Sequence, residues 1–224
     1  MVGNAVVLLR TAKRKLSRRV PKLIQSSARK HARQIGEIAL AWNALQDALF
    51  VLFWAIATEN RYEDYHKAHA IWHTLQSDRL QRELLMAVAN ANLNLPKRLV
   101  GHLKWVVERT AKLSEFRNDA IHTPVRFVPL TSGQAIPIPA EISARKQAVE
   151  RLRQTPTAQT WRRVRGDLIV LADFCNAIYG HIVVSGLSTT WPDRPRLLTI
   201  TSKARKRRKS ILRERKLSKP SRRP

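Results

Sequence analysis

Six consecutive residues near the middle of the chain, from Arg117 to His122, combine side chains that can act on a phosphodiester. Their order is Arg-Asn-Asp-Ala-Ile-His. The planar guanidinium of an arginine is permanently charged and can bind a phosphate through two donors. Histidine is the side chain that titrates near neutral pH and can therefore move protons during a reaction. This pairing of Arg117 with His122 predicts a candidate site for chemistry at phosphate.

The charge of the chain points to a polyanionic partner. The formal net charge is +26 over 224 residues. Residues 1–33 contain ten lysines and arginines and no acid, and residues 203–224 contain twelve against a single acid, Glu214. Such basic arms bind phosphate backbones without reading sequence, through counterion release. We therefore expect nonspecific nucleic-acid affinity, although a merely solubilising tail would have the same composition.

Cysteine content and hydropathy narrow the class of protein. One cysteine, Cys175, excludes an intramolecular disulfide framework and a cysteine-rich zinc site. The longest apolar run, residues 48–57, is shorter than the roughly twenty residues that span a bilayer. We therefore expect a cytoplasmic protein with no transmembrane segment, no metal and no cofactor.

Four segments have the periodicity of amphipathic helices, with apolar residues at three- and four-residue steps. The clearest begins near Ile35, and the others cover about 64–91, about 96–122 and about 158–185. Their predicted buried stripes are Ile35, Ile38, Trp42, Leu45, Leu49, Leu52 and Ile56; then Ile71, Leu75, Leu80, Leu84, Leu85 and Val88; then Leu99, Leu103, Val106, Leu113, Phe116 and Ala120; and finally Trp161, Val164, Leu168, Leu171, Cys175, Ile178 and Ile182. The predicted fold is all-α, an up-down four-helix bundle.

An irregular proline-rich insertion, residues 123–139, separates the third and fourth helices. Its four prolines exclude a continuous helix and allow either a short edge hairpin about Ser132-Gly133 or an extended loop. A short helix is expected over 141–153. The predicted organisation is a basic N-terminal extension over 1–33, a helical domain over 34–187, and a basic, disordered C-terminal tail over 188–224.

The position of the motif in a helix limits how its side chains can converge. In a straight α-helix, Arg117 and His122 point about 140° apart, whereas Asn118 and His122 are about 40° apart. Either the helix end is distorted before Pro124, or a second protomer completes the site across a twofold axis. A plain structural role also fits, because His122 near a helix C-terminus interacts favourably with the dipole.

The segment from Arg117 to His122 resembles the Arg-x4-His signature of the HEPN superfamily. The first helix, with Trp42-Asn43 and Asp47, is similar to the opening helix of that family, and the resemblance covers about residues 34–185. It implies a metal-independent endoribonuclease of a toxin–antitoxin or defence system, active as a homodimer on RNA. It also implies catalytic roles for three residues: His122 would transfer protons, Arg117 would stabilise charge on the phosphate, and Asn118 would orient it. The resemblance further implies an antitoxin or regulatory protein as a partner. The alternative is a noncatalytic nucleic-acid-binding or regulatory helical protein.

Two further groups have spacings that could carry function. His66, His69 and His73 could line one helical face as metal ligands, but a solvated histidine-rich face explains their spacing equally well. The six tryptophans are expected to anchor the core or an interface. Trp105, which lies beside Lys104 and off the main apolar stripe, is the best exception and the best candidate for stacking on a base.

Overall fold

The computed structural model describes residues 2–130, 132, 134–139, 157–184 and 190–199, and the chain divides into two compact units. The first unit comprises residues 1–39 and 118–162, and the second comprises residues 40–117 and 163–224. The described residues are mostly helical, and they contain one two-stranded sheet. This confirms the mostly helical class. The helix predicted over 141–153 lies outside the described residues. Of the tail predicted over 188–224, the structure describes residues 190–199, in which Trp191 and Leu197 are buried.

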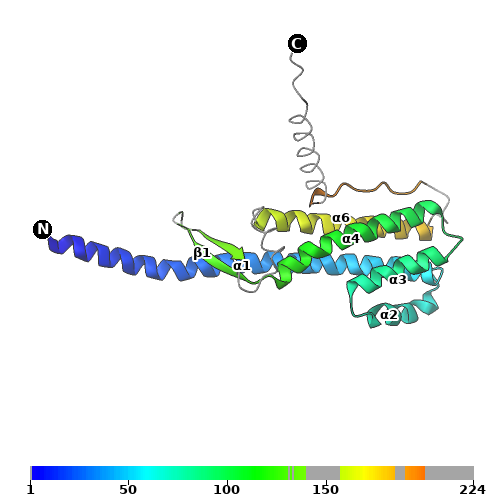
Figure 1. Ribbon diagram of the computed structural model, residues 1–224, viewed down its shortest axis with the longest axis horizontal. Helices are drawn as coiled ribbons and strands as arrows, with labels where there is room; N and C mark the ends of the chain where they lie inside the picture. The colour runs from blue at the N-terminus through cyan, green and yellow to red at the C-terminus, as the bar shows by residue number, and fades with distance from the viewer. Residues whose placement is uncertain (1, 131, 133, 140–156, 185–189, 200–224) are drawn as a thin grey trace, which may run out of the picture. The chain divides into compact units, whose positions relative to one another are not determined.

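Helix α1 runs from Val2 to Ala57 and contains Pro21 (Figure 1). It begins far ahead of the periodic stripe that starts near Ile35, so the basic N-terminal segment is helical too. Within the stripe, Ile38 and Leu45 are buried and Ile35 is half-buried. The other predicted stripe members, Trp42, Leu49, Leu52 and Ile56, are also buried. The stripe prediction for this helix is therefore confirmed.

The helix expected over 64–91 is two helices. A short 3₁₀ turn (η1, Tyr62–Asp64) leads into α2, Tyr65–Thr74, and α3 follows over Asp78–Ala91. Ser77 caps α3, because its hydroxyl oxygen accepts a hydrogen bond from the Leu80 backbone amide at 3.3 Å. The predicted stripe was partly wrong, since Ile71 and Leu80 are exposed while Leu85 is buried.

Helices α4, Lys97–His122, and α6, Thr157–Val184, match the two remaining predictions closely. Leu103 in α4 and Leu168 in α6 have no exposed surface. Phe174 of α6 lies edge-on to Trp105 of α4, with 5.5 Å between ring centroids, so the two helices pack together in the second unit. Their buried apolar residues are Leu99, Leu103, Val106, Leu113 and Ala120 in α4, and Trp161, Val164, Leu168, Leu171, Ala172, Phe174, Cys175 and Ile178 in α6.

The proline-rich insertion forms the hairpin that was one of its two predicted alternatives. Strand β1, Val125–Pro129, pairs antiparallel with β2, Ala135–Pro139, and Phe127 lies opposite Pro137. The amide of Leu130 donates to the Gln134 carbonyl at 2.6 Å and closes the turn. A two-stranded sheet has only edge strands, which is where proline is tolerated.

Within the described part of the chain, two stretches of helix are long and apolar enough to cross a membrane. These are Val20–Ala57 and Ala158–Val184, and each contains an 18-residue window with a mean hydropathy of 1.5. The windows are 61% and 44% buried inside the protein, and the core helix of a soluble protein passes the same test of length and composition. The absence of a transmembrane segment therefore stays a prediction.

Candidate functional site

The last turn of α4 carries the end of the Arg117–His122 motif. The Thr123 amide donates to the Asp119 carbonyl at 3.2 Å, which is the i to i−4 bond of a regular α-helix. Pro124 follows, and the helix ends at His122. Asp119 and Ala120 are buried, with 7% and 3% of their surfaces exposed. The buried side of the last turn is therefore fixed by packing.

Asn118 and His122 lie on an exposed side of that turn. Both side chains are exposed, and one helical turn separates them. An imidazole and a carboxamide at this spacing can face one ligand together. The helix thus brings Asn118 and His122 onto one accessible face, and His122 has the access that a proton-transfer residue needs.

Arg117 has different surroundings, which belong to the second unit. Its guanidinium carbon lies 5.5 Å from the centroid of the Trp42 ring, and Trp42 has 1% of its surface exposed. This is the geometry of a cation–π interaction, which holds a guanidinium against an aromatic face. Arg117 is half-buried.

The three histidines of α2 make contacts with neighbouring aromatic rings. His66, His69 and His73 are all exposed, and the rings of His69 and His73 are 4.2 Å apart. His69 also lies edge-on to Phe50, at 5.3 Å between centroids. Within the part of the chain that the structure describes, no group of three His, Cys, Asp or Glu residues is placed to hold a metal ion. The aromatic arrangement supports the solvated-face explanation for these histidines.

Burial shapes the chemistry of the one thiol. Cys175 lies in the core of the second unit with no exposed surface, and burial raises the pKa of its thiol far above the usual range. A thiolate is the nucleophilic form of cysteine, so this environment disfavours nucleophilic catalysis by Cys175.

A cavity of about 400 Å³ opens in the second unit at the ends of α1, α3 and α6. Asn60, Asn92 and Asn94 supply polar groups to its lining. Glu59 also lines it, but no histidine, lysine or arginine does. The cavity therefore lacks the cation and the proton-transfer group that phosphodiester chemistry requires.

The sequence prediction missed two basic residues around Trp105, namely Arg109 and Arg194. Both guanidiniums lie within 6 Å of the Trp105 ring centroid, at 5.6 and 5.9 Å. The spacing of Trp105 and Arg109 on one face of α4 was visible in the sequence. Arg194 comes from a segment without periodicity, and only the fold brings it to this ring.

Comparisons of the chain with protein-family models, with curated proteins and with solved structures find no match.

Proposed function

We propose that this protein is a metal-independent endoribonuclease of the HEPN type, with Arg117, Asn118 and His122 as its site. The observation that carries the proposal is the exposed pair of Asn118 and His122 on the last turn of α4. These two residues stand in the Arg-x4-His pattern, and His122 is accessible to a ligand. The high positive charge of the chain supports a polyanionic substrate.

The proposed reaction uses the ribose 2′-hydroxyl of the RNA as the nucleophile. The 2′ oxygen forms a bond to the adjacent phosphorus, and the bond from phosphorus to the 5′ oxygen of the next nucleotide breaks. One proton leaves the 2′-hydroxyl and one proton reaches the departing 5′ oxygen, so imidazoles suit both transfers. Arg117 offsets the charge that builds on the phosphate, and Asn118 orients it by hydrogen bonding. The products are a 2′,3′-cyclic phosphate and a 5′-hydroxyl.

The angle between the motif side chains supports a homodimer as the active form. A regular helix points Arg117 and His122 about 140° apart, so one motif cannot direct both at a single phosphate. A second copy related by a twofold axis supplies the missing groups from the same surface. A cytoplasmic location, a role in a toxin or defence system and an antitoxin partner belong to the same proposal.

A second function is supported by the contact between Arg117 and Trp42. If the guanidinium serves to cover the buried indole, the motif is structural and the protein is a noncatalytic nucleic-acid-binding or regulatory helical protein. The two functions differ in what Arg117→Ala does. If Arg117 is structural, the substitution lowers only the stability of the protein. If Arg117 is catalytic, the substitution lowers the cleavage rate even when the protein is fully folded.

The test compares the wild type with His122→Ala on generic RNA in the presence of a chelator. Loss of a general acid or base slows a reaction about 10²–10⁴-fold, so the variant should lose nearly all cleavage. The control is His66→Ala, which removes another exposed helical histidine and should cleave like the wild type. Both variants should keep the helical signal and melting temperature, because neither side chain is buried. Equal cleavage by His122→Ala and wild type would refute the catalytic assignment.

A further inference from the structure

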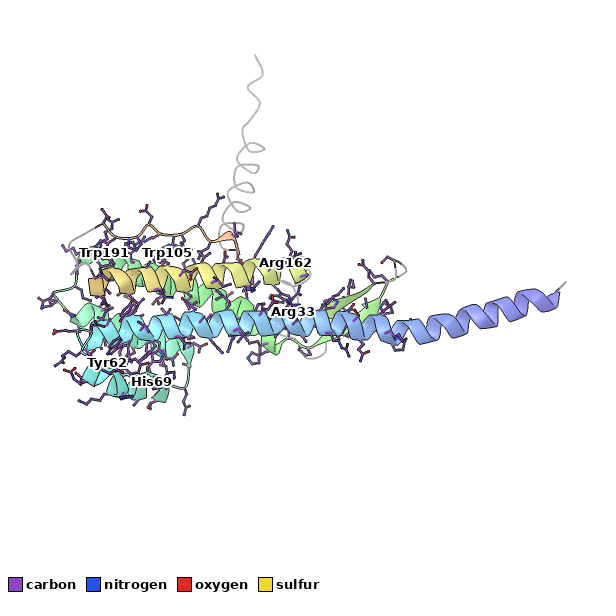
Figure 2. The ribbon with its side chains drawn as sticks, turned by 180° about the vertical axis from the view of Figure 1, so that it is seen from behind. Arg33, Tyr62, His69, Trp105, Arg162 and Trp191 are labelled. Carbon is purple, nitrogen blue, oxygen red and sulfur yellow. The ribbon has the colours of Figure 1, made fainter. Side chains whose placement is uncertain are left out.

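Two arginine side chains converge on one tryptophan in the second unit. The guanidinium carbons of Arg109 and Arg194 lie 5.6 and 5.9 Å from the centroid of the Trp105 ring. Trp105 is half-buried on α4, and Figure 2 shows it on the side of the unit where Trp191 also lies. An aromatic face attracts each cation, but two like charges on one ring repel each other. An anion bound between the two guanidiniums would offset this repulsion.

Arg194 is held in place by its own hydrogen bonds. Its Nη2 donates to the Gly101 carbonyl at 2.8 Å, and its Nε donates to His102 Nδ1 at 3.4 Å. A guanidinium has five N–H donors, so these two bonds leave roughly three donors for a ligand. The side chain is exposed. Because Arg194 is already positioned, binding a phosphate costs it little conformational entropy.

The segment that carries Arg194 is fixed at both sides of this residue. Trp191 is buried, with its ring 4.1 Å from that of His181. Further along, the carboxylate of the buried Asp167 accepts hydrogen bonds from the Leu198 and Thr199 amides, at 2.7 and 2.6 Å. Residues 190–199 therefore hold Arg194 against α4, and the chain continues from them into the basic stretch 203–224.

Arg109 is the partner cation on α4. Among the described residues its side chain forms neither an ion pair nor a hydrogen bond, and its guanidinium lies over the Trp105 ring. The acids nearest in sequence are Glu108 and Asp193. Glu108 is set about 60° around the helix from Trp105, and Asp193 precedes Arg194. Neither acid forms an ion pair with these arginines, so no carboxylate among the described residues occupies either guanidinium.

The cations continue along the same face of α4. Arg98, Trp105, Arg109 and Lys112 follow steps of seven, four and three residues, which keep them within about 40° of Trp105 around the helix. Arg98 and Lys112 are exposed. A row of positive charges with a planar ring in it matches the repeating phosphates and bases of a single nucleic-acid strand.

We infer that Trp105, Arg109 and Arg194 form a phosphate-binding site for single-stranded RNA. This inference rests on the proposed function for the identity of the nucleic acid. The two guanidiniums bind backbone phosphates through paired donors, and the Trp105 ring holds them in position. Planar guanidiniums match phosphate geometry better than lysines do, and both cations at this ring are arginines.

The test measures binding of a short, fluorescently labelled 2′-O-methyl RNA, which cannot supply the attacking hydroxyl and so stays intact. The variant Arg109→Gln with Arg194→Gln should bind less tightly, and the slope of log affinity against log salt should fall by about 1.4 for two lost single-strand contacts. Between 50 and 200 mM salt, the wild type should then lose about sevenfold more affinity than the variant does. The single variant Arg109→Gln should show half of the change in slope, and it breaks no hydrogen bond among the described residues.

The matched control is Arg61→Gln with Arg79→Gln, which removes two exposed arginines from other elements of the same unit. This control should keep at least most of the wild-type slope. An equal loss of affinity and salt slope in the control and in the variant would show nonspecific attraction and would overturn the site. Binding by the variant that matches the wild type would overturn it as well. Preferential binding of acidic lipid vesicles over the RNA would also overturn it. Because the probe is uncleavable, these outcomes are independent of whether His122→Ala abolishes cleavage.

Discussion

Among the residues whose burial the structure describes, the two units differ sharply in how many apolar side chains they bury. The second unit, residues 40–117 and 163–224, contains fully buried leucines on α1, α3, α4 and α6. In the described part of the first unit, residues 1–39 and 118–162, the buried side chains are His31, Ile38, Asp119, Ala120, Ala135 and Trp161. Burial of apolar area is the main source of folding stability. Within the described residues, most of the apolar burial that stabilises the fold therefore lies in the second unit.

This difference separates folding from the proposed chemistry. Asn118 and His122 belong to the first unit and are exposed, so changing them removes little packing. Arg109 and Arg194 belong to the well-packed second unit but lie at its surface around Trp105. Both proposed sites can thus be altered while the core stays intact, which makes their loss of function interpretable.

The largest expected effect is on the free energy of unfolding, which a substitution in the second unit should lower more than a substitution in the first. Leu103→Ala should lower the free energy of unfolding by about 2–5 kcal/mol, since Leu103 is completely buried. Phe127→Ala should cost about 1 kcal/mol, because Phe127 is half-buried and its ring meets His31 edge-on at 5.8 Å. Urea unfolding of both variants measures the two losses. Equal losses would contradict the difference between the units.

A smaller, local effect is expected at Asp167. Asp167→Ala removes the acceptor of the Leu198 and Thr199 amides and should cost about 1–3 kcal/mol. Hydrogen exchange should accelerate at those two amides, with little change at Leu103 in α4. Asp173→Ala, at an exposed position of the same helix, is the control. Unchanged exchange at Leu198 and Thr199 would show that these bonds do not hold the segment.

The smallest expected effect is a pH dependence of the free energy of unfolding, to which one histidine in each unit contributes. Burial lowers the pKa of His31 below the ordinary 6.5. The pKa of His102 is lowered by burial and then by Arg194 and Arg98, against a smaller opposing effect of Asp193. Each histidine therefore takes up its proton more readily in the unfolded chain. The stability they contribute is complete above about pH 6.5 and is lost as the pH falls below it.

Two variants measure this contribution, one for each unit. His31→Asn and His102→Asn should each flatten the decline in the free energy of unfolding as the pH is lowered from about 7 to about 5. His66→Asn, at an exposed site, serves as the control. A decline that is as steep in both variants as in the wild type would refute the role of these histidines.

Helix faces were predictable from the sequence because apolar periodicity reports burial directly. The stripes of α1, α4 and α6 were confirmed almost residue by residue. The break between α2 and α3 was missed, although Ser77 followed by Asp78 is a recognisable helix start. The early start of α1 was missed because the basic run from Arg10 to Arg33, which contains Pro21, lacks a regular apolar stripe.

Contacts between distant segments were not predictable in this way. Nothing in the local pattern of residues 190–199 indicated that Asp167 would bind their amides or that Arg194 would reach Trp105. The exposure of His122 and the shared face with Asn118 did follow from helical geometry. The placement of Arg117 over Trp42 required the fold, because it joins two helices far apart in sequence.

The most direct test of the proposed ribonuclease is the fate of the 2′-hydroxyl. Wild-type protein would be incubated, with chelator, on an RNA and on its 2′-O-methyl counterpart, and the ends of the products would be identified by mass spectrometry. The account predicts cleavage of the unmodified RNA alone, leaving 2′,3′-cyclic phosphate and 5′-hydroxyl ends. Cleavage of the 2′-O-methyl RNA, or cleavage of the unmodified RNA that stops when metal is chelated, would contradict it.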